Sequence, residues 1–100
     1  MNSVMFSDRT SDIDSMHTIT CTLDNLPLNK IGKIIKIDVS LSQHRRLADM
    51  GFLIGKNVLP LYKSPFDDPT AYKISGGTIA LRKAVSSGIS VKYISIGDGL

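Results

Sequence analysis

The sequence contains a single cysteine, Cys21, among its 100 residues. One cysteine excludes an intramolecular disulfide, and no Cys/His spacing typical of a zinc site accompanies it. The class of small secreted proteins held together by disulfides is therefore excluded. A hydrophobic core must stabilise the fold instead, and a single domain of this length can bury enough surface to form one.

Long apolar runs are also missing, because Lys, Arg, Asp or Ser interrupts each hydrophobic stretch within a few residues. No segment is expected to span a bilayer. The N-terminal stretch carries Asp8, Arg9 and Asp12 and lacks a basic region followed by an apolar one, so it predicts no signal peptide. The expected location is the cytoplasm, without direct insertion into a membrane.

The charge balance is mildly basic, with a formal net charge of +3 and a pI of about 9.2. Hydrophobic residues make up 42% and charged residues 21%, values near the globular average that exclude a wholly disordered chain. The basic excess favours anionic partners, such as acidic protein surfaces, nucleic acid or anionic lipid. It is equally common in ordinary soluble domains.

Short segments with alternating apolar residues predict a mainly β domain over residues 18–97. Residues 1–17 are rich in Ser, Asp and Thr and predict a flexible N-terminal tail, and residues 98–100 a C-terminal one. The segments expected to form strands are 18–23, 32–39, 57–63, 71–75, 78–81 and 89–93. Pro60 indicates an edge strand or a bulge, and Gly76-Gly77 indicates a two-residue hairpin loop.

One short helix is predicted between the second and third strands. Ser40 and Gln43 match a capping box, with Ser40 as the N-cap residue. The helix should continue to about Met50 and end at Gly51, where a left-handed residue is favoured. A second helical turn is expected over residues 82–88. Six short strands and one short helix suggest a small β-barrel, because closure removes exposed strand edges.

Three blocks of the sequence together resemble the FeoA family. The run 45–58 resembles the FeoA signature, in which a helix that begins with basic residues ends in Leu-x-x-hydrophobic-Gly and a second glycine follows. The run 64–69 resembles the family's Pro-hydrophobic-Gly-Asp-Pro hairpin, which here contains Pro65, Asp67, Asp68 and Pro69. The runs 79–83 and 89–91 resemble its Leu-Arg-Lys strand end and its closing strand.

This resemblance implies an SH3-like β-barrel that has no catalytic residue and no cofactor. It implies a cytoplasmic accessory protein of ferrous iron uptake that binds the FeoB-type membrane permease. One departure from the family pattern is Asp67, which stands where the family usually has Gly. Aspartate tolerates the left-handed region better than most other residues, so the hairpin can still form.

The helix and the loop after it are the expected partner-binding surface. Arg45 and Arg46 suit an interface with an acidic surface, although a solvated helix face is equally compatible with them. The resemblance places an apolar contact at Leu47, a position more typical of the core. The full predicted partner-binding set is Arg45, Arg46, Leu47, Met50 and Phe52.

No catalytic or metal site is predicted. Asp67 and Asp68 are expected to accept hydrogen bonds from backbone N–H groups of the turn, because no further acid or base accompanies them. His17 and Cys21 lie four residues apart in a predicted strand, which separates them too far to share a metal. Despite the resemblance to iron-transport proteins, we expect no high-affinity iron site.

Two other functions stay open at this stage. The chain could be an SH3-like regulatory module of a metal-dependent transcription system, although no DNA-binding domain accompanies it. It could also be a small basic barrel that binds nucleic acid through Tyr62, Phe66, Tyr72 and Tyr93, although no RNA-binding motif is present. A weak homo-oligomer through an unpaired strand edge is also open.

Overall fold

The computed structural model describes residues 16–96. Its elements, in chain order, are β1 (Met16–Thr22), the 3-10 helix η1 (Leu23–Asn25), β2 (Gly32–Ile37), α2 (Leu41–Asp49), β3 (Asn57–Lys63), β4 (Thr70–Ile74), β5 (Gly77–Leu81), α3 (Lys83–Ser86) and β6 (Ile89–Ile96). Met16 and His17 belong to β1, because they pair with Ile96 and Ser95, and not to the predicted tail. The rest of both predicted tails, together with residue 97 of the predicted domain, lies outside the described residues.

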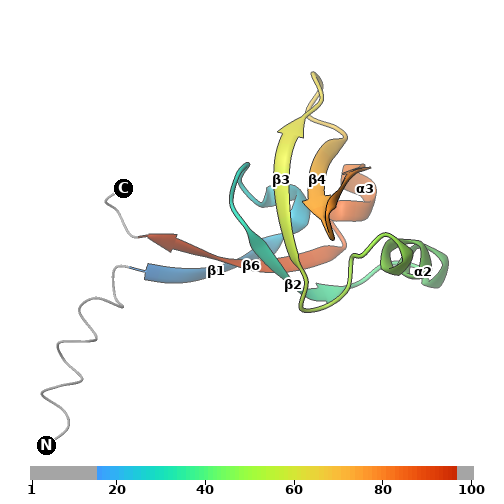
Figure 1. Cartoon of the computed structure of the whole chain (residues 1–100), viewed down its shortest axis with the longest axis horizontal. Helices are drawn as coiled ribbons and strands as arrows, with labels where there is room; N and C mark the ends of the chain where they lie inside the picture. The colour runs from blue at the N-terminus through green and yellow to red at the C-terminus, as the bar shows by residue number, and fades with distance from the viewer. Residues whose placement is uncertain (1–15, 97–100) are drawn as a thin grey trace, which may run out of the picture.

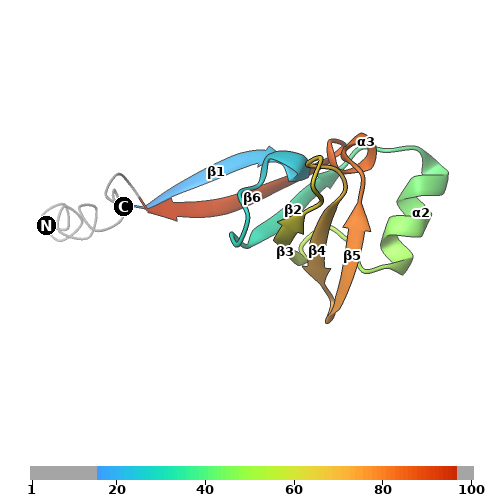
Figure 2. The ribbon, with the colours of Figure 1, turned by 90° about the horizontal axis from the view of Figure 1, so that it is seen from above.

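The six strands form one antiparallel sheet in the order β1-β6-β2-β3-β4-β5. The predicted mainly β fold class is confirmed. The sheet curls around its core, while β1 and β6 continue away from the other strands as a two-stranded ribbon (Figures 1 and 2). Helix α2 lies at the opposite end of the molecule from this ribbon (Figure 1). Strands β1 and β5 are the two ends of this curled sheet.

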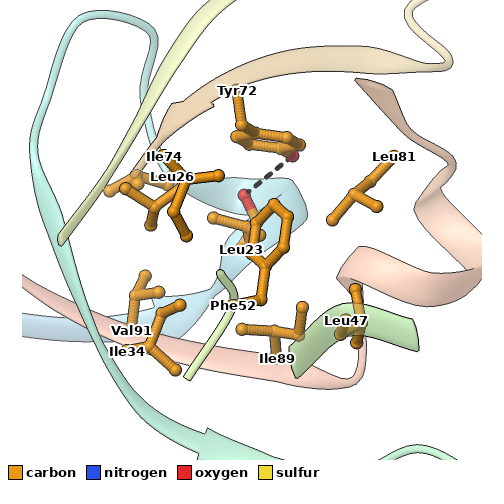
Figure 3. Close-up of a cluster of buried hydrophobic side chains, with 11 residues drawn as sticks. Leu23, Leu26, Ile34, Leu47, Phe52, Tyr72, Ile74, Leu81, Ile89 and Val91 are labelled. Carbon is orange, nitrogen blue, oxygen red and sulfur yellow. Dashed lines mark hydrogen bonds between the residues drawn. The ribbon is translucent and has the colours of Figure 1, made fainter. Parts of the chain in front are cut away.

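Buried side chains from β2 to β6, η1 and α2 meet in a single hydrophobic core, and Cys21 of β1 packs against it (Figure 3). Its fully buried members include Leu23, Ile34, Phe52, Tyr72 and Val91. Burial of these side chains is the main stabilising contribution to the fold. The hydroxyl of Tyr72 donates a hydrogen bond of 3.4 Å to the backbone carbonyl of Leu23, which satisfies the phenol and ties β4 to η1.

We expect the buried Tyr72 to make the fold sensitive to alkaline pH. Burial raises the pKa of its phenol above the ordinary value of 10.0. The folded state therefore holds this proton more tightly than the unfolded state, and stability falls as pH rises above about 10. Melting curves between about pH 9 and pH 11 should show a smaller loss of Tm for Tyr72→Phe than for the wild type. Tyr62→Phe is the matched control because Tyr62 is exposed, and an equal effect of both substitutions would contradict the assignment.

Helix α2 begins and ends as its sequence predicts. The backbone N–H of Gln43 donates to the hydroxyl of Ser40, so the N-cap is confirmed. At the other end, Gly51 adopts a φ of +100°, the left-handed conformation expected after the helix. The next residue, Phe52, donates its N–H to the carbonyl of Leu47 and turns its ring into the core. The helix is thus anchored at its C-terminal end.

Two details of the hairpins differ from the predictions or refine them. The β4–β5 turn has Ser75 and Gly76 at its centre, both with positive φ, and Gly77 already pairs with Ile74. The prediction of Gly76-Gly77 was therefore wrong by one residue, because Ser75 adopts the left-handed conformation that a glycine was expected to supply. Pro60 lies in β3, an interior strand, at a register shift of the β3–β4 ladder, which confirms a bulge and not an edge.

Three strands end earlier than predicted, and β4 does so by one residue, at Ile74. Strand β1 stops at Thr22 because Leu23 enters η1, where its side chain is fully buried. Strand β2 stops at Ile37, and the N–H of Asp38 then donates to the carbonyl of Gly88 at 2.7 Å. That bond connects the start of β6 to the segment leading into α2 and so fixes where the helix is placed.

Candidate partner-binding site

A groove of about 300 Å³ lies between α2 and the segment formed by β5 and α3. We call it the α2–β5 groove. Its apolar lining comes from Leu47, Met50, Leu81 and Val85. Helix α2 lies beside β5, the last strand of the sheet, so the groove opens next to an unpaired strand edge (Figure 2).

Two arginines line the α2–β5 groove, Arg46 from the helix and Arg82 from the residue before α3. Both are exposed, and no Asp or Glu is among the lining residues. The site therefore combines an apolar interior with positive charge alone. Such a combination suits an apolar side chain or segment flanked by carboxylates, since arginine pairs with carboxylates in a planar, bidentate geometry.

The structure separates the five predicted partner-binding residues into three groups. Arg46, Leu47 and Met50 line the α2–β5 groove, and Arg45 is exposed on the same helix. Leu47 is only 2% exposed and belongs to the core, so it forms the floor of the groove and offers a partner little contact area. Phe52 is fully buried in the core and lines no part of the groove. Its side chain positions the end of α2 from inside the fold and is not accessible to a partner in this conformation.

Sequence reasoning missed the residues that complete the groove from the other side. Leu81, Arg82 and Val85 are more than 30 positions away from α2 in the chain and reach it only through the folding of the sheet. The sequence did contain a signal for Leu81 and Arg82, because the run 79–83 is one of the blocks that resemble FeoA. That block was interpreted as the end of a strand and not as part of a binding surface.

Apolar side chains are also exposed near the helix. Leu41, the first residue of α2, is 68% exposed, and Ile54, in the loop after the helix, is 65% exposed. Leu53 beside it is exposed as well. Leu53 and Ile54 lie together after the C-terminal end of α2 and add contact area there that a partner could cover, whereas Leu41 lies at the other end of the helix.

The predicted hairpin motif has a structural role. Asp67 adopts a φ of +66°, so an aspartate occupies the left-handed position where the family usually has glycine. The Oδ1 atom of Asp68 accepts a 2.8 Å hydrogen bond from the backbone N–H of Lys83, the first residue of α3. This bond goes to α3 and not to an N–H group of the turn as expected, so it ties the hairpin to α3. Pro65 and Pro69 flank this turn, and the carbonyl of Pro69 accepts from the N–H of Ser64.

The side chains with ligand or nucleophile chemistry do not gather into a reactive centre. Within residues 16–96, no three His, Cys, Asp or Glu side chains cluster so that they could hold a metal ion. Burial raises the pKa of the Cys21 thiol, and the carboxylate of Asp24 raises it further. A thiol that keeps its proton is a poor nucleophile and a poor metal ligand. No helix in the described part of the chain has the length and apolar character needed to cross a bilayer.

The aromatic residues considered for stacking on nucleic acid do not share one surface. Tyr72 is buried in the core, whereas Tyr62 and Phe66 are exposed near the β3–β4 hairpin. Tyr93 is partly buried in β6, on the far side of β2 from β3. A row of bases could not stack on all four, because stacking platforms need aromatic faces that follow one strand path.

Comparison with protein families finds a match to the FeoA domain over residues 21–93. A comparison with curated proteins finds no match. The similar solved structures include iron(II) transport protein A from Clostridium thermocellum, with 30% identity and a TM-score of 0.69. That match covers 72% of this chain, which spans 44% of the length of the other.

A second similar structure is Stenotrophomonas maltophilia FeoA in complex with zinc, described as an SH3 domain protein possibly acting as a ferrous iron transport activating factor. It is 27% identical with a TM-score of 0.61, over 70% of this chain and 87% of that one. A manganese-dependent transcriptional repressor is 17% identical with a TM-score of 0.68, over 77% of this chain and 43% of that one. This last likeness shows the fold alone.

Proposed function

The chain belongs to the FeoA family of non-catalytic accessory domains with an SH3-like fold, associated with ferrous iron transport, and from this premise we propose a partner-binding role for it. The proposed partner is the FeoB-type membrane ferrous iron permease, which the chain binds from the cytoplasmic side. The proposed contact surface is the α2–β5 groove, together with the exposed residues of α2 and its following loop.

The observation that carries this proposal is the chemistry of the α2–β5 groove. Its apolar lining and the two arginines Arg46 and Arg82 match the composition of protein interfaces, which are enriched in arginine around an apolar centre. A permease segment with an apolar side chain between acidic ones has the complementary chemistry.

A binding module of this kind acts by changing the populations of its partner's states. The permease must expose the complementary segment better in one conformation than in another for binding to have an effect. The accessory domain then stabilises that conformation in proportion to the difference in affinity. No bond is made or broken in this mechanism, in agreement with a family of non-catalytic domains.

The test is a pull-down of the full-length permease, and separately of its soluble cytoplasmic domain, with this chain at low and moderate salt. We expect the wild type to retain at least one of the two. The variant Arg46→Glu/Arg82→Glu should lose about tenfold or more in affinity, because two charges are reversed at the contact surface. Circular dichroism and Tm measurements confirm that this variant is folded.

The matched control is Lys36→Glu/Lys63→Glu, which makes the same change in net charge at exposed residues outside the α2–β5 groove. Retention of the permease by this control, and its loss by the groove variant, would support the proposal. Equal loss in both variants would indicate non-specific charge attraction and contradict the groove assignment. If wild-type chain retains neither form of the permease, the proposed partner is wrong.

The two alternatives have less support from the structure. The likeness to the manganese-dependent repressor is one of fold, so it favours no regulatory role. The nucleic-acid alternative loses its stacking surface because Tyr72 is buried.

A further inference from the structure

A second and larger hollow lies between the segment 29–31 and the β1–β6 ribbon, with a volume of about 590 Å³. We call it the lysine groove. Its principal lining residues are Lys30, Ile31, Lys33, Lys92, Tyr93 and Ile94. It shares no residue with the α2–β5 groove, and the ribbon beside it lies at the other end of the molecule from α2 (Figure 1).

The charge of the lysine groove has one sign. Lys30, Lys33 and Lys92 are all exposed, and the lining contains no Asp or Glu. Lys33 and Lys92 stand directly opposite each other in the β2–β6 ladder. Like charges at directly opposed positions destabilise a sheet, so the free protein carries a repulsion that a bound anionic group would relieve.

The lysine groove also lies along an open strand edge. Strand β6 continues to Ile96, but its last pairing with β2 is at Lys92. The residues that precede β2 do not continue the pairing with β6, because the N–H of Asn29 donates to the carbonyl of Pro60 in β3. Among the described residues, the part of β6 beyond Lys92 therefore pairs with β1 alone. Every second residue there directs its N–H and C=O groups away from β1, toward the groove.

The two faces of this open edge differ in chemistry. Lys92 lies on the face that carries Lys33, its cross-strand partner, and the exposed Ile94 lies on that face two residues farther along β6. Tyr93 lies on the other face, opposite Ile19 in the β1–β6 ladder. A strand added at this edge would place alternate side chains on the face of the lysines and Ile94 and on the face of Tyr93. Acidic and apolar residues in alternation complement the two faces.

We propose that the lysine groove binds an extended acidic peptide segment, which adds to the open edge of β6 as a third strand of the ribbon. Backbone hydrogen bonds hold the segment, carboxylates face Lys30, Lys33 and Lys92, and apolar side chains pack against Tyr93. A two-stranded ribbon is only marginally stable by itself, and a third strand stabilises it. This site is separate from the proposed permease contact and does not depend on it.

The probe is a capped octapeptide of alternating Glu and Val, titrated into the ¹⁵N-labelled full chain at low salt and followed by NMR. We expect saturable shifts of backbone amides confined to residues 29–33 and 91–95. A second octapeptide, with four Glu followed by four Val, has the same composition without the alternation. It should bind at least several-fold more weakly, because it cannot present carboxylates on one face and apolar groups on the other.

The decisive variant is Lys33→Glu, which should weaken binding of the alternating peptide by roughly tenfold or more. Its Tm should be no lower than that of the wild type, because the substituted carboxylate would face Lys92 and replace a repulsive pair by an attractive one. Loss of binding cannot then be attributed to unfolding. The matched control is Lys36→Glu on the same strand, which lies outside the lysine groove and should bind as the wild type does.

Three results would overturn the proposal. The first is the absence of saturable shifts. The second is that the two octapeptides bind equally well, or that Lys33→Glu and Lys36→Glu weaken peptide binding equally, because either result would show bulk charge attraction. The third is found by sedimenting the chain with phosphatidylserine vesicles. Sedimentation that Lys33→Glu abolishes, without any peptide binding, would assign the lysine groove to an anionic lipid surface.

Discussion

Phe52→Ala is expected to remove about 3–5 kcal/mol from the free energy of unfolding, a loss that few domains of this size tolerate. The Phe52 side chain has 0% exposure and lies in the core between the end of α2 and the sheet. Its removal leaves a cavity in this core that the surrounding elements can fill only in part. Urea unfolding followed by circular dichroism measures the change.

Phe66→Ala is the matched control for this substitution. Phe66 is 90% exposed in the β3–β4 hairpin, so the same chemical change there should alter stability by no more than about 0.5 kcal/mol. A small effect at Phe52 would mean that the ring is not packed as described. The comparison also bears on function, because weaker permease binding by Phe52→Ala would reflect displacement of α2 and not loss of a direct contact.

Gly51→Ala is expected to have the second largest effect, about 2–5 kcal/mol of destabilisation. Two separate costs contribute. The φ of +100° is one that residues with a side chain rarely adopt. In addition, an added Cβ would overlap the Oγ atom of Ser75 in the β4–β5 turn and lie 2.9 Å from its Cβ atom. Thermal and urea unfolding of the variant measure the sum.

Gly55→Ala separates the two costs. Gly55 has a similar φ of +94°, but no atom lies within 4 Å of a Cβ added there. This variant should lose only the conformational part, about 1–2 kcal/mol. In the Gly51→Ala background, Ser75→Gly removes the obstructing side chain and should restore part of the stability, as a double-mutant cycle would show. Equal losses at Gly51 and Gly55 would contradict the close approach to Ser75.

Local rules explain why much of the fold was predictable. The capping of α2 by Ser40, its end at Gly51 and the extent of β3 depend on neighbours in the chain, whose hydrogen bonds and conformational preferences are local. The predictions were wrong where contacts between residues far apart in the chain determine the local structure. Leu23 continues an alternating pattern that predicts a strand, but its burial in the core goes with the 3-10 helix η1.

The sequence by itself determined the fold class, the family and the residues of the helix, because periodicity, caps and motif spacing are properties of contiguous residues. Only the tertiary structure decided which side chains form surfaces. It buried Phe52, brought Arg82 to Arg46 across the α2–β5 groove, and set Lys33 opposite Lys92 beside an open edge of β6. These relations join residues far apart in the chain. They depend on strand order and register, which follow from burying a common core and not from any local pattern.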